Sequence, residues 1–370
     1  MKIEFFRHNI NQKDIENVTT VLNSIFLTNA DITRNFEEKF TQYLNSKYCV
    51  ALSSCTAALH LSLIALGIQE GDEVITTPMS FVATSNAILH AGATPVFVDV
   101  ERESGNIDAT LIEAAITKKT KAIIPVHLYG NMCDMKKIKE IADKYNLVII
   151  EDAAHCIEGE RDGIRVGELS DVACFSFYAT KNITSGEGGA VTTNNPKIYE
   201  MLMRLRLHGI NKDASSRYTG KYQHWDMNIL GWKYNISDIQ AALLIDQLVR
   251  IKENLVKREE IATFYERNLN QLPKIKLLQL PKNSKSARHL FTILVDDRDE
   301  VILKFQESGI GVATNYRPIH LLNYYQERYE YKQGDYPIAE EIGEKTISIP
   351  LYPRLKQEEI EYIVRFIKSF

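Results

Sequence analysis

The stretch CFSFYATKNITSGEGGA occupies residues 174–190 and combines three features within a short distance. It begins with an apolar, aromatic run of the kind that forms a buried strand. Lys181 follows this run, and glycines stand at positions 186, 188 and 189. Lysine is rarely buried unless it is paired or has a chemical role. Lys181 therefore lies either on a surface loop, as most lysines do, or at a functional site.

Similar apolar runs precede this stretch and alternate with helix-like segments. The runs are YCVALSS (48–54), EVITT (73–77), TPVFVDV (94–100), KAIIPVH (121–127), LVIIED (147–152) and VACFSFY (172–178). The helix-like segments include TAALHLSLIALG (56–67), SFVATSNAILHAG (80–92) and DMKKIKEIADKYN (134–146). This alternation predicts an α/β fold with a mostly parallel sheet. The nearly continuous apolar strands indicate that helices cover both faces of that sheet.

A second region begins near residue 236. Residues 236–269 contain no Pro or Gly and predict one long helix. A loop rich in Pro and Lys (281–289), a strand (291–297) and a further helix (300–309) follow it. We therefore expect a large α/β domain over residues 1–240 and a small C-terminal α+β domain over residues 241–370.

Composition excludes several classes of protein. The net charge of -4 provides no basic surface for nucleic acid. No apolar run is long enough to span a membrane, and the N-terminal sequence MKIEFFRHNINQKD lacks the apolar centre of a signal peptide. The cysteines have no metal-binding spacing and fit reduced thiols in a cytoplasmic protein. They are Cys49, Cys55, Cys133, Cys156 and Cys174.

Two of the expected strands end in residues suited to ligand binding, which in open α/β sheets occurs at the carboxyl ends of strands. A helix start near Thr56 offers free N–H groups and a hydroxyl for a phosphate, although the same residues also suit a simple helix cap. Asp152 ends another strand, where a buried carboxylate needs a cationic partner, an arginine or a turn to cap. Zinc binding by Asp152, His155 and Cys156 is less favoured, because no second cluster completes a tetrahedral site.

Lys181 ends a third strand of the same sheet. A phosphate site, an acid and an amine at neighbouring strand ends match the three reactive parts of pyridoxal phosphate. These are its phosphate, its pyridine nitrogen and its aldehyde. The residues therefore predict pyridoxal phosphate as the cofactor and no metal ion.

Several long stretches resemble the nucleotide-sugar aminotransferase (DegT/StrS) family of fold-type I pyridoxal phosphate enzymes. They are SSCTAAL (53–59), GDEVITTPMSFVATSNAILHAGATPVFVDV (71–100), AIIPVHLYGNMCDM (122–135), VIIEDAAHCI (148–157), FSFYATKNITSGEGGAV (175–191) and LGWKYNISDIQAAL (230–243). The resemblance spans most of the chain in the expected order. It implies a seven-stranded sheet between helices and an enzyme that transfers an amino group.

The resemblance also implies individual roles. Lys181 would hold the cofactor covalently and move a proton, and Asp152 would bind the pyridine nitrogen. Phe81 would stack on the cofactor ring, and His155 would lie near its phenolic oxygen. The phosphate would be held by Thr56, Ser176 and the amides of Cys55 and Ala57. Cys55 stands where relatives usually have glycine.

Other positions are expected to serve a partner subunit or the substrate. Within GWKYN (231–235), Lys233 and Asn235 replace the usual Asn and Arg and would reach the phosphate of a neighbouring subunit, which implies a homodimer. Tyr316 and His320 are candidate sugar contacts. Thr28 and Asn29 are further candidates, in a segment where Ala30-Asp31 replaces the family's usual Gly-Pro.

The expected reaction transfers nitrogen from L-glutamate to a nucleotide-linked keto-sugar. The spellings KNIT and GWKYN are similar to those of the 4-amino-arabinose branch, which favours amination at C4 of a 4-keto-6-deoxyhexose. Alternatives are a 3-aminating enzyme, or a non-catalytic regulator that binds the cofactor. A dehydratase of the same fold would carry histidine at the position of Lys181. Candidates for the carboxylate site of the donor are Arg204, Arg206 and Arg317.

Overall fold

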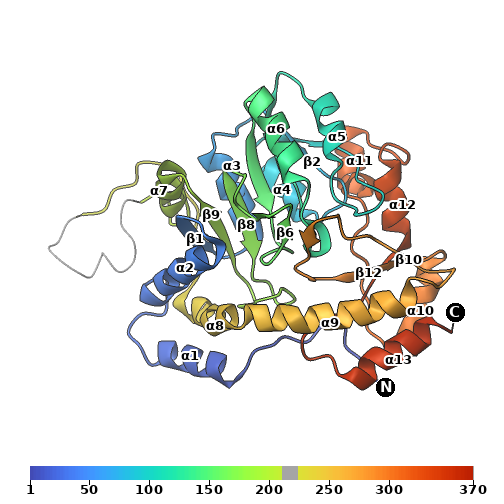
Figure 1. The fold of residues 1–370 in the computed structure, drawn as a ribbon. Helices are drawn as coiled ribbons and strands as arrows, with labels where there is room; N and C mark the ends of the chain where they lie inside the picture. The colour runs from blue at the N-terminus through green and yellow to red at the C-terminus, as the bar shows by residue number, and fades with distance from the viewer. Residues whose placement is uncertain (211–223, 370) are drawn as a thin grey trace.

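The computed structural model describes residues 1–210 and 224–369. Figure 1 shows a central sheet enclosed by helices, with a smaller C-terminal region beside it. The strands of the central sheet are β1 (Tyr48–Leu52), β2 (Glu73–Thr76), β3 (Thr94–Phe97), β4 (Thr120–Ile123), β5 (Val148–Asp152), β8 (Val172–Ser176) and β9 (Gly189–Thr193).

The seven strands follow the order β1-β9-β8-β5-β4-β2-β3. Every neighbouring pair from β8 to β3 is parallel, while β9 runs antiparallel to both β1 and β8. The predicted α/β fold with a mostly parallel sheet is therefore confirmed. The carboxyl ends of β1, β2, β5 and β8 consequently meet at one edge of the sheet.

Helices cover both faces of the sheet (Figure 1). One face packs against α2 (Asp31–Leu44), α6 (Met135–Tyr145) and α8 (Asp238–Val249), and the other against α3 (Cys55–Ala65), α4 (Ala83–His90) and α7 (Pro196–Leu205). On the first face, Phe40 lies edge-on to Phe175 with ring centroids 5.0 Å apart. All residues of β8 and β9 are buried. Burial on both faces explains why these strands lack a polar alternation.

The C-terminal region contains an antiparallel sheet of β10 (Lys276–Leu277), β12 (Phe291–Leu294) and β13 (Thr346–Ile349). Tyr265, Phe305 and Ile363 are fully buried in its core, which also includes Ile3 from the start of the chain. Ile3 pairs with Ile310 in a short parallel bridge. The helices of this region are α9 (Ile251–Leu269), α10 (Arg298–Glu307), α11 (Asn323–Tyr329), α12 (Pro337–Lys345) and α13 (Gln357–Ile367).

The remaining elements are short or peripheral. They are α1 (Gln12–Leu22), α5 (Ala109–Ile112), three 3₁₀ turns (Glu113–Ala115, Leu128–Gly130 and Ile319–Leu321), and the small sheet of β6 (Glu160–Arg161), β7 (Ile164–Arg165) and β11 (Ser284–Lys285). No helix in the described part of the chain is both long enough and apolar enough to cross a membrane.

The expected single helix over residues 236–269 is instead two helices that meet at Arg250. This residue has φ -98° and ψ 12°, and its guanidinium pairs with Asp14 of α1 and Asp246 of α8. Leu244 and Leu248 of α8 belong to the core beneath the central sheet. Helix α8, which spans residue 240, thus packs with the central sheet. The domain boundary at residue 240 stays a prediction.

Gly189 allows the start of β9 to approach the N-terminus of α3. A Cβ atom at this position would lie 2.4 Å from the carbonyl carbon of Ser54 and 2.5 Å from the nitrogen of Cys55. Real Cβ atoms do not approach backbone this closely, so only glycine fits. The glycine-rich part of residues 174–190 therefore brings the Lys181 loop against the helix start at residue 55.

A buried ion pair connects α7 and α2 to strand β1. Arg206, at the end of α7, donates to Glu37 Oε1 of α2 at 2.5 Å and to the carbonyl oxygen of Ala51 in β1 at 3.0 Å. Glu37 Oε1 also accepts from the amide of Ala51 at 2.8 Å. The two side chains are 3% and 9% exposed. Arg206 therefore has a structural role and is not available to a substrate.

Replacing Arg206 with Met should destabilise the protein by about 3–5 kcal/mol, because Glu37 would remain charged, buried and unpaired. Chemical unfolding monitored by circular dichroism measures this change. Arg204→Met is the matched control, since Arg204 is exposed on the same helix and its loss should change stability by less than about 0.5 kcal/mol. Equal losses in the two variants would contradict a structural role for the ion pair.

Candidate active site

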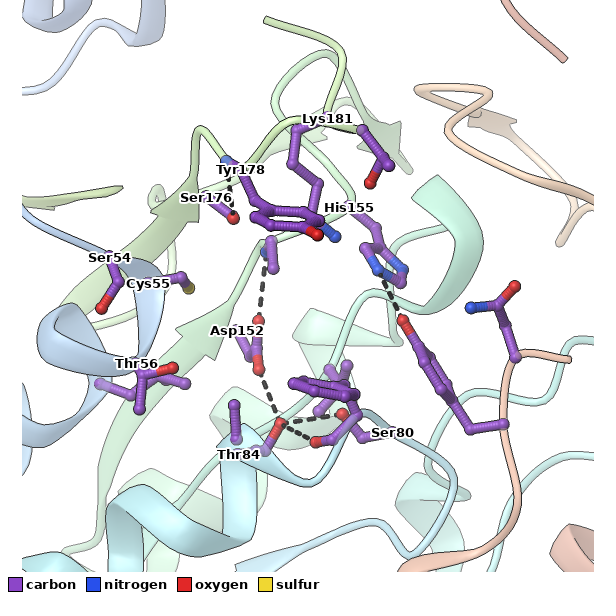
Figure 2. Close-up of a pocket in the computed structure, with 18 of the residues that line it drawn as sticks. Ser54, Cys55, Thr56, Ser80, Thr84, Asp152, His155, Ser176, Tyr178 and Lys181 are labelled. Carbon is purple, nitrogen blue, oxygen red and sulfur yellow. Dashed lines mark hydrogen bonds between the residues drawn. The ribbon is translucent and has the colours of Figure 1, made fainter. Parts of the chain in front are cut away.

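A cavity of about 520 Å³ lies at the carboxyl ends of the parallel strands. Figure 2 shows Lys181, Asp152 and the helix start at Ser54–Thr56 around this space. Residues from β1, β2, β5 and β8, or from the turns that follow these strands, form most of its wall. The lining residues that the sequence predicted are Cys55, Thr56, Phe81, Asp152, His155, Ser176, Lys181 and Tyr316.

The N-terminus of α3 provides two unused backbone amides. Ser54 caps the helix, since its Oγ accepts from the amide of Ala57 at 3.0 Å and its carbonyl oxygen accepts from Ala58. Within residues 1–210 and 224–369, the amides of Cys55 and Thr56 have no hydrogen-bond partner. The cap already uses the Ala57 amide and Ala57 does not line the cavity, so its contact with the phosphate stays a prediction. The unused amides belong to the two preceding residues.

Cys55 fits the first position of this helix without strain. Its φ is not positive, so glycine is not required at this residue. The close backbone approach that requires glycine occurs instead at Gly189. Ser176 also lines the cavity, and its Oγ accepts from the amide of Tyr178 at 3.3 Å. Together with the Thr56 hydroxyl, these groups give α3 a polar site suited to a phosphate.

Asp152 ends β5 and is 5% exposed. Its Oδ2 accepts from Thr84 Oγ1 at 2.8 Å, and its Oδ1 accepts from the amide of Ala154 at 3.1 Å. Ser80 in turn donates to Thr84 Oγ1 at 2.8 Å. Burial raises the pKa of Asp152, while these donors and Lys181 oppose the rise. A cationic ring nitrogen in the cavity would further favour the ionised carboxylate.

Lys181 lies in the loop between β8 and β9. This loop is closed by hydrogen bonds from the Phe177 amide to the Gly188 carbonyl at 2.8 Å and from the Ser185 amide to the Phe177 carbonyl at 3.0 Å. Burial lowers the pKa of Lys181 to about 8. No described residue forms a hydrogen bond or ion pair with its amine. At physiological pH a pKa near 8 gives the amine a much larger neutral fraction than an ordinary lysine has, and the amine is available for reaction.

His155 and two aromatic residues form the opposite wall. His155 Nδ1 accepts from the amide of Tyr129 at 3.2 Å, which places the proton of the neutral ring on Nε2. Nε2 lies 3.2 Å from the Tyr316 hydroxyl, and burial lowers the pKa of His155 well below its usual value. Phe81 is 59% exposed, with its ring 6.0 Å from that of Tyr316. This exposed ring is suited to stacking on a planar ligand.

His320 does not line the cavity, and its role in sugar binding stays a prediction. Its side chain is fully buried, and Nε2 lies 2.9 Å from Glu340 Oε1. The 3₁₀ turn Ile319–Leu321 directs this ring away from Tyr316 and against Tyr336. Tyr316 and His320 are four positions apart, but only Tyr316 lines the cavity.

The other predicted contacts also lie outside the cavity of their own chain. Thr28 is exposed, and Asn29 is buried. Lys233 donates to Asn235 Oδ1, and neither residue lines the cavity. These residues can reach an active site only if a second subunit brings them there, and their roles stay predictions.

Several lining residues were not predicted from the sequence. Ser80 and Thr84 follow β2 at a spacing of four residues, which is a detectable signal for one face of a helix. Phe5 comes from the N-terminal segment and carries no comparable signal. The other polar or aromatic ones are Ser54, Tyr178, Thr180, Glu187 and Asn315. The described residues include no group of three His, Cys, Asp or Glu placed to hold a metal ion.

Residues 8–368 match the model of the DegT/DnrJ/EryC1/StrS aminotransferase family. The chain belongs to this family. It is 38% identical to the spore coat polysaccharide biosynthesis protein SpsC of Bacillus subtilis, with 97% of this chain and 95% of SpsC covered. It is 35% identical to GDP-perosamine synthase of Escherichia coli O157:H7, with 100% and 98% of the two chains covered.

The fold is also that of solved sugar aminotransferases. The putative sugar aminotransferase Spr1654 of Streptococcus pneumoniae, in its PMP form, superimposes with a TM-score of 0.94 at 32% identity. The alignment covers 100% of this chain and 98% of Spr1654. The same protein has been solved in a PLP form. The family member described here is a pyridoxal-phosphate-dependent sugar aminotransferase.

The residues of the cavity fit this cofactor. The amides of Cys55 and Thr56 would hold the phosphate, Asp152 would hold the ring nitrogen, and Lys181 would bond to the aldehyde carbon. The exposed ring of Phe81 would cover the pyridine ring. The two amides and the Lys181 amine have no partner among the described residues. Asp152 accepts one hydrogen bond at each carboxylate oxygen and can accept a further one.

The amine of Lys181 should react with pyridoxal phosphate in a pH-dependent manner. Because its pKa is lowered to about 8, attachment to the cofactor-free protein should be half-maximal near that pH, and not near the value of about 10.4 for an ordinary lysine. Absorbance spectra recorded across pH 6–11 measure the extent of attachment.

Borohydride reduction and peptide mapping identify the lysine involved. Lys181→Ala should lose the covalent label, whereas Lys197→Ala, a change at an exposed lysine on α7, should retain it. A label on any other lysine in the wild-type protein would overturn the assignment.

Proposed function

We propose that the protein transfers the amino group of L-glutamate to a nucleotide-linked keto-sugar, in two half-reactions within one cavity. The observation that carries this proposal is the convergence of the Lys181 amine, the Asp152 carboxylate and the free amides of Cys55 and Thr56 on that cavity. Pyridoxal phosphate, when bound, supplies an aldehyde that accepts the amino group and a ring that withdraws electrons.

The protein's own groups then have distinct roles. Lys181 Nζ removes the proton from the α-carbon of the amino donor, which its lowered pKa favours by giving it a larger neutral fraction than an ordinary lysine has. Asp152 stabilises positive charge on the ring nitrogen, and the hydrogen bonds from Thr84 and Ala154 fix the orientation of its carboxylate. Aromatic residues on the opposite wall exclude water from the reacting atoms.

The proposed acceptor is a 4-keto-6-deoxyhexose on a nucleotide, aminated at C4. Two relatives support the general class, since one is named for spore coat polysaccharide biosynthesis and the other for GDP-perosamine, a nucleotide-linked sugar. The KNIT and GWKYN spellings support C4. Tyr316 lies at the cavity wall beside His155, where its hydroxyl can orient the keto carbon. The product would serve surface polysaccharide, and we place the reaction in the cytoplasm.

A panel of nucleotide keto-sugars with L-glutamate tests this function. The expected result is a mass change that corresponds to replacement of oxygen by an amino group, with nitrogen at C4 by NMR and release of 2-oxoglutarate. Lys181→Ala is the inactive control. Nitrogen at C3 would contradict the proposed position but not the class of reaction. A complete lack of amination across the panel would contradict the proposed acceptor.

We also propose a homodimer with shared active sites. Lys233 and Asn235 lie outside the cavity of their own chain, while their backbone is anchored through bridges to Leu207 and Leu52. A two-fold arrangement would bring these side chains to the phosphate of the partner subunit, near the N-terminus of α3. Thr28 and Asn29 would approach the partner's substrate in the same way.

Mixing two inactive variants tests the shared site. Lys181→Ala and the double variant Lys233→Ala/Asn235→Ala should each have little activity as pure proteins. In a mixed dimer, one of the two sites contains both intact contributions, so a fraction of the activity should return after subunits exchange. Activity assays before and after exchange measure this recovery. Full activity in a sedimenting monomer would rule out a shared site.

A further inference from the structure

A second cavity of about 20 Å³ adjoins the active-site cavity and shares Thr180 and Lys181 with it. Three parts of the chain that are distant in sequence contribute to its wall. They are the N-terminal segment with Phe6, Arg7 and Asn9, the helices α8 and α9 with Gln247 and Arg258, and the loop Leu351–Pro353. The remaining lining residues are Asn182, Thr184 and His289. The volume suffices for one small polar group but not for a second cofactor.

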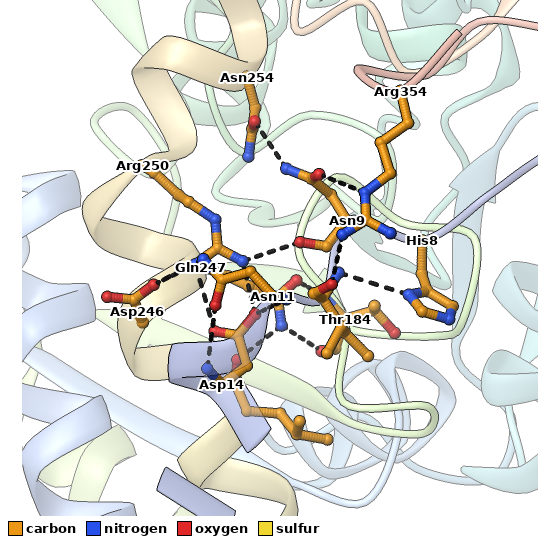
Figure 3. Close-up of polar contacts among 12 residues, drawn as sticks. His8, Asn9, Asn11, Asp14, Thr184, Asp246, Gln247, Arg250, Asn254 and Arg354 are labelled. Carbon is orange, nitrogen blue, oxygen red and sulfur yellow. Dashed lines mark hydrogen bonds and ion pairs between the residues drawn. The ribbon is translucent and has the colours of Figure 1, made fainter. Parts of the chain in front are cut away.

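Asn9, Thr184 and Gln247 of this wall are already hydrogen-bonded, either to each other or to residues outside the wall (Figure 3). Asn9 donates to Asn254 Oδ1 at 2.8 Å, and its Oδ1 accepts from Arg354 Nε at 3.1 Å. Gln247 accepts from the amide of Thr184 at 3.0 Å and donates to the Thr184 carbonyl oxygen at 2.7 Å. These residues close the cavity and leave little capacity for a ligand.

Arg258 and Tyr352 are different. Arg258 is 2% exposed, and its Nη2 donates to Glu158 Oε1 at 2.5 Å and to the Ala287 carbonyl oxygen at 3.2 Å. Its Nε and Nη1 are buried and have no partner among the described residues, and the same holds for the hydroxyl of Tyr352. Buried donors without an acceptor are costly and rare. The two cavity-lining residues Arg258 and Tyr352 together carry three such atoms.

The charge of the wall indicates what these donors bind. Arg7, Lys181 and Arg258 line the cavity, and no Asp or Glu does. Arg7 pairs with Glu359 outside the cavity at 3.3 Å, and Arg258 pairs with Glu158. A carboxylate accepts several hydrogen bonds and forms strong ones with a guanidinium. The free donors therefore match an anionic oxygen ligand better than a neutral or cationic one.

We propose that Arg258 and Tyr352 form the subsite for the α-carboxylate of the amino donor. This inference rests on the proposed use of L-glutamate. The amine of the donor must reach the position where the amine of Lys181 reacts, and in an α-amino acid the carboxylate is attached to the carbon that bears that amine. A carboxylate subsite that shares Lys181 with the active site meets this requirement.

The three arginines considered from the sequence are less suitable. Arg206 is held by Glu37 and Ala51, and Arg204 is exposed on α7. Arg317 lines neither cavity. Among the described residues, Arg258 is thus the arginine that lines a cavity with Lys181 and has buried donors without a partner, whereas Arg7, in the same wall, is partly exposed.

Tyr352→Phe is the first test, because it removes one hydroxyl that has no partner and keeps the ring. The half-saturating concentration of L-glutamate should rise roughly tenfold, as expected for loss of a hydrogen bond to a charged group. The sugar half-reaction should not change. Tyr362→Phe is the matched control, since its hydroxyl donates to the Ser308 carbonyl oxygen at 3.1 Å and does not line the cavity.

Arg258→Lys is the second variant, because it keeps a positive charge beside Glu158 while it removes the unpaired guanidinium donors. It should weaken use of L-glutamate at least as much as Tyr352→Phe, with normal thermal unfolding. Glutamine and isoglutamine distinguish the two carboxylates of the donor. With isoglutamine, which lacks the α-carboxylate, the half-saturating concentrations of wild type and Tyr352→Phe should be equal. With glutamine, which keeps the α-carboxylate, the two concentrations should still differ.

Calorimetry with glutarate provides a readout that does not depend on catalysis. Glutarate should bind the wild-type holoenzyme and Tyr362→Phe equally, and Tyr352→Phe and Arg258→Lys more weakly. Equal glutarate binding by all four proteins would overturn the assignment of Arg258 and Tyr352 to the carboxylate subsite. The same holds if Tyr352→Phe weakens the glutamate and sugar half-reactions equally. An absence of any glutamate half-reaction in the wild type, together with discriminating glutarate binding, would instead contradict the proposed donor and leave the anion site standing.

Discussion

Desolvation of the active-site cavity is the constraint on which the chemistry depends. Burial favours the neutral form of both an amine and a carboxylate, so it lowers the pKa of Lys181 and raises that of Asp152. The surrounding donors then distinguish the two groups. Asp152 receives hydrogen bonds from Thr84 and Ala154, whereas no described residue pairs with the Lys181 amine. The cavity thus supports a reactive neutral amine next to a carboxylate that can hold its charge.

The residue that follows Lys181 connects this site to the rest of the structure. Asn182 donates to Glu158 Oε2 at 2.8 Å and to the Ala287 carbonyl oxygen at 3.0 Å. Arg258 uses the other oxygen of Glu158 and the same carbonyl. The position of the catalytic lysine and the orientation of the Arg258 guanidinium therefore depend on one buried carboxylate. Such shared networks make the geometry of neighbouring subsites interdependent.

The sequence was informative where function follows from the order of strands and turns. Asp152 ends β5 and Lys181 lies in the loop that follows the parallel strand β8, so their proximity could be predicted from periodicity and from the rule for strand ends. The cap at Ser54 is also local, but the choice between the amides of Thr56 and Ala57 depends on which one the serine side chain uses. That choice needs atomic geometry, because only the structure shows that the Ser54 side chain accepts from the Ala57 amide.

Residues whose roles depend on distant packing were not predictable. His320 follows Tyr316 closely, yet a tight turn and Glu340 determine that it is buried elsewhere. Arg258 lies in a helix segment rich in charged residues, where an arginine normally faces solvent. Only the fold shows that Glu158, a hundred positions earlier, and the loop at Ala287 bury it. Phe5 belongs to the same class, because no local pattern marks an N-terminal residue as part of a cavity wall.

The wall behind Lys181 also has a consequence for the order in which the molecule assembles. Asn9 and Arg354, which are joined by a hydrogen bond beside that wall, are separated by 345 positions. Contacts between such distant segments form late, because the chain between them must already be ordered. The central sheet can therefore reach its native arrangement while the space behind the lysine is still open to water. Completion of that wall is the step that would convert a folded sheet into a competent catalyst.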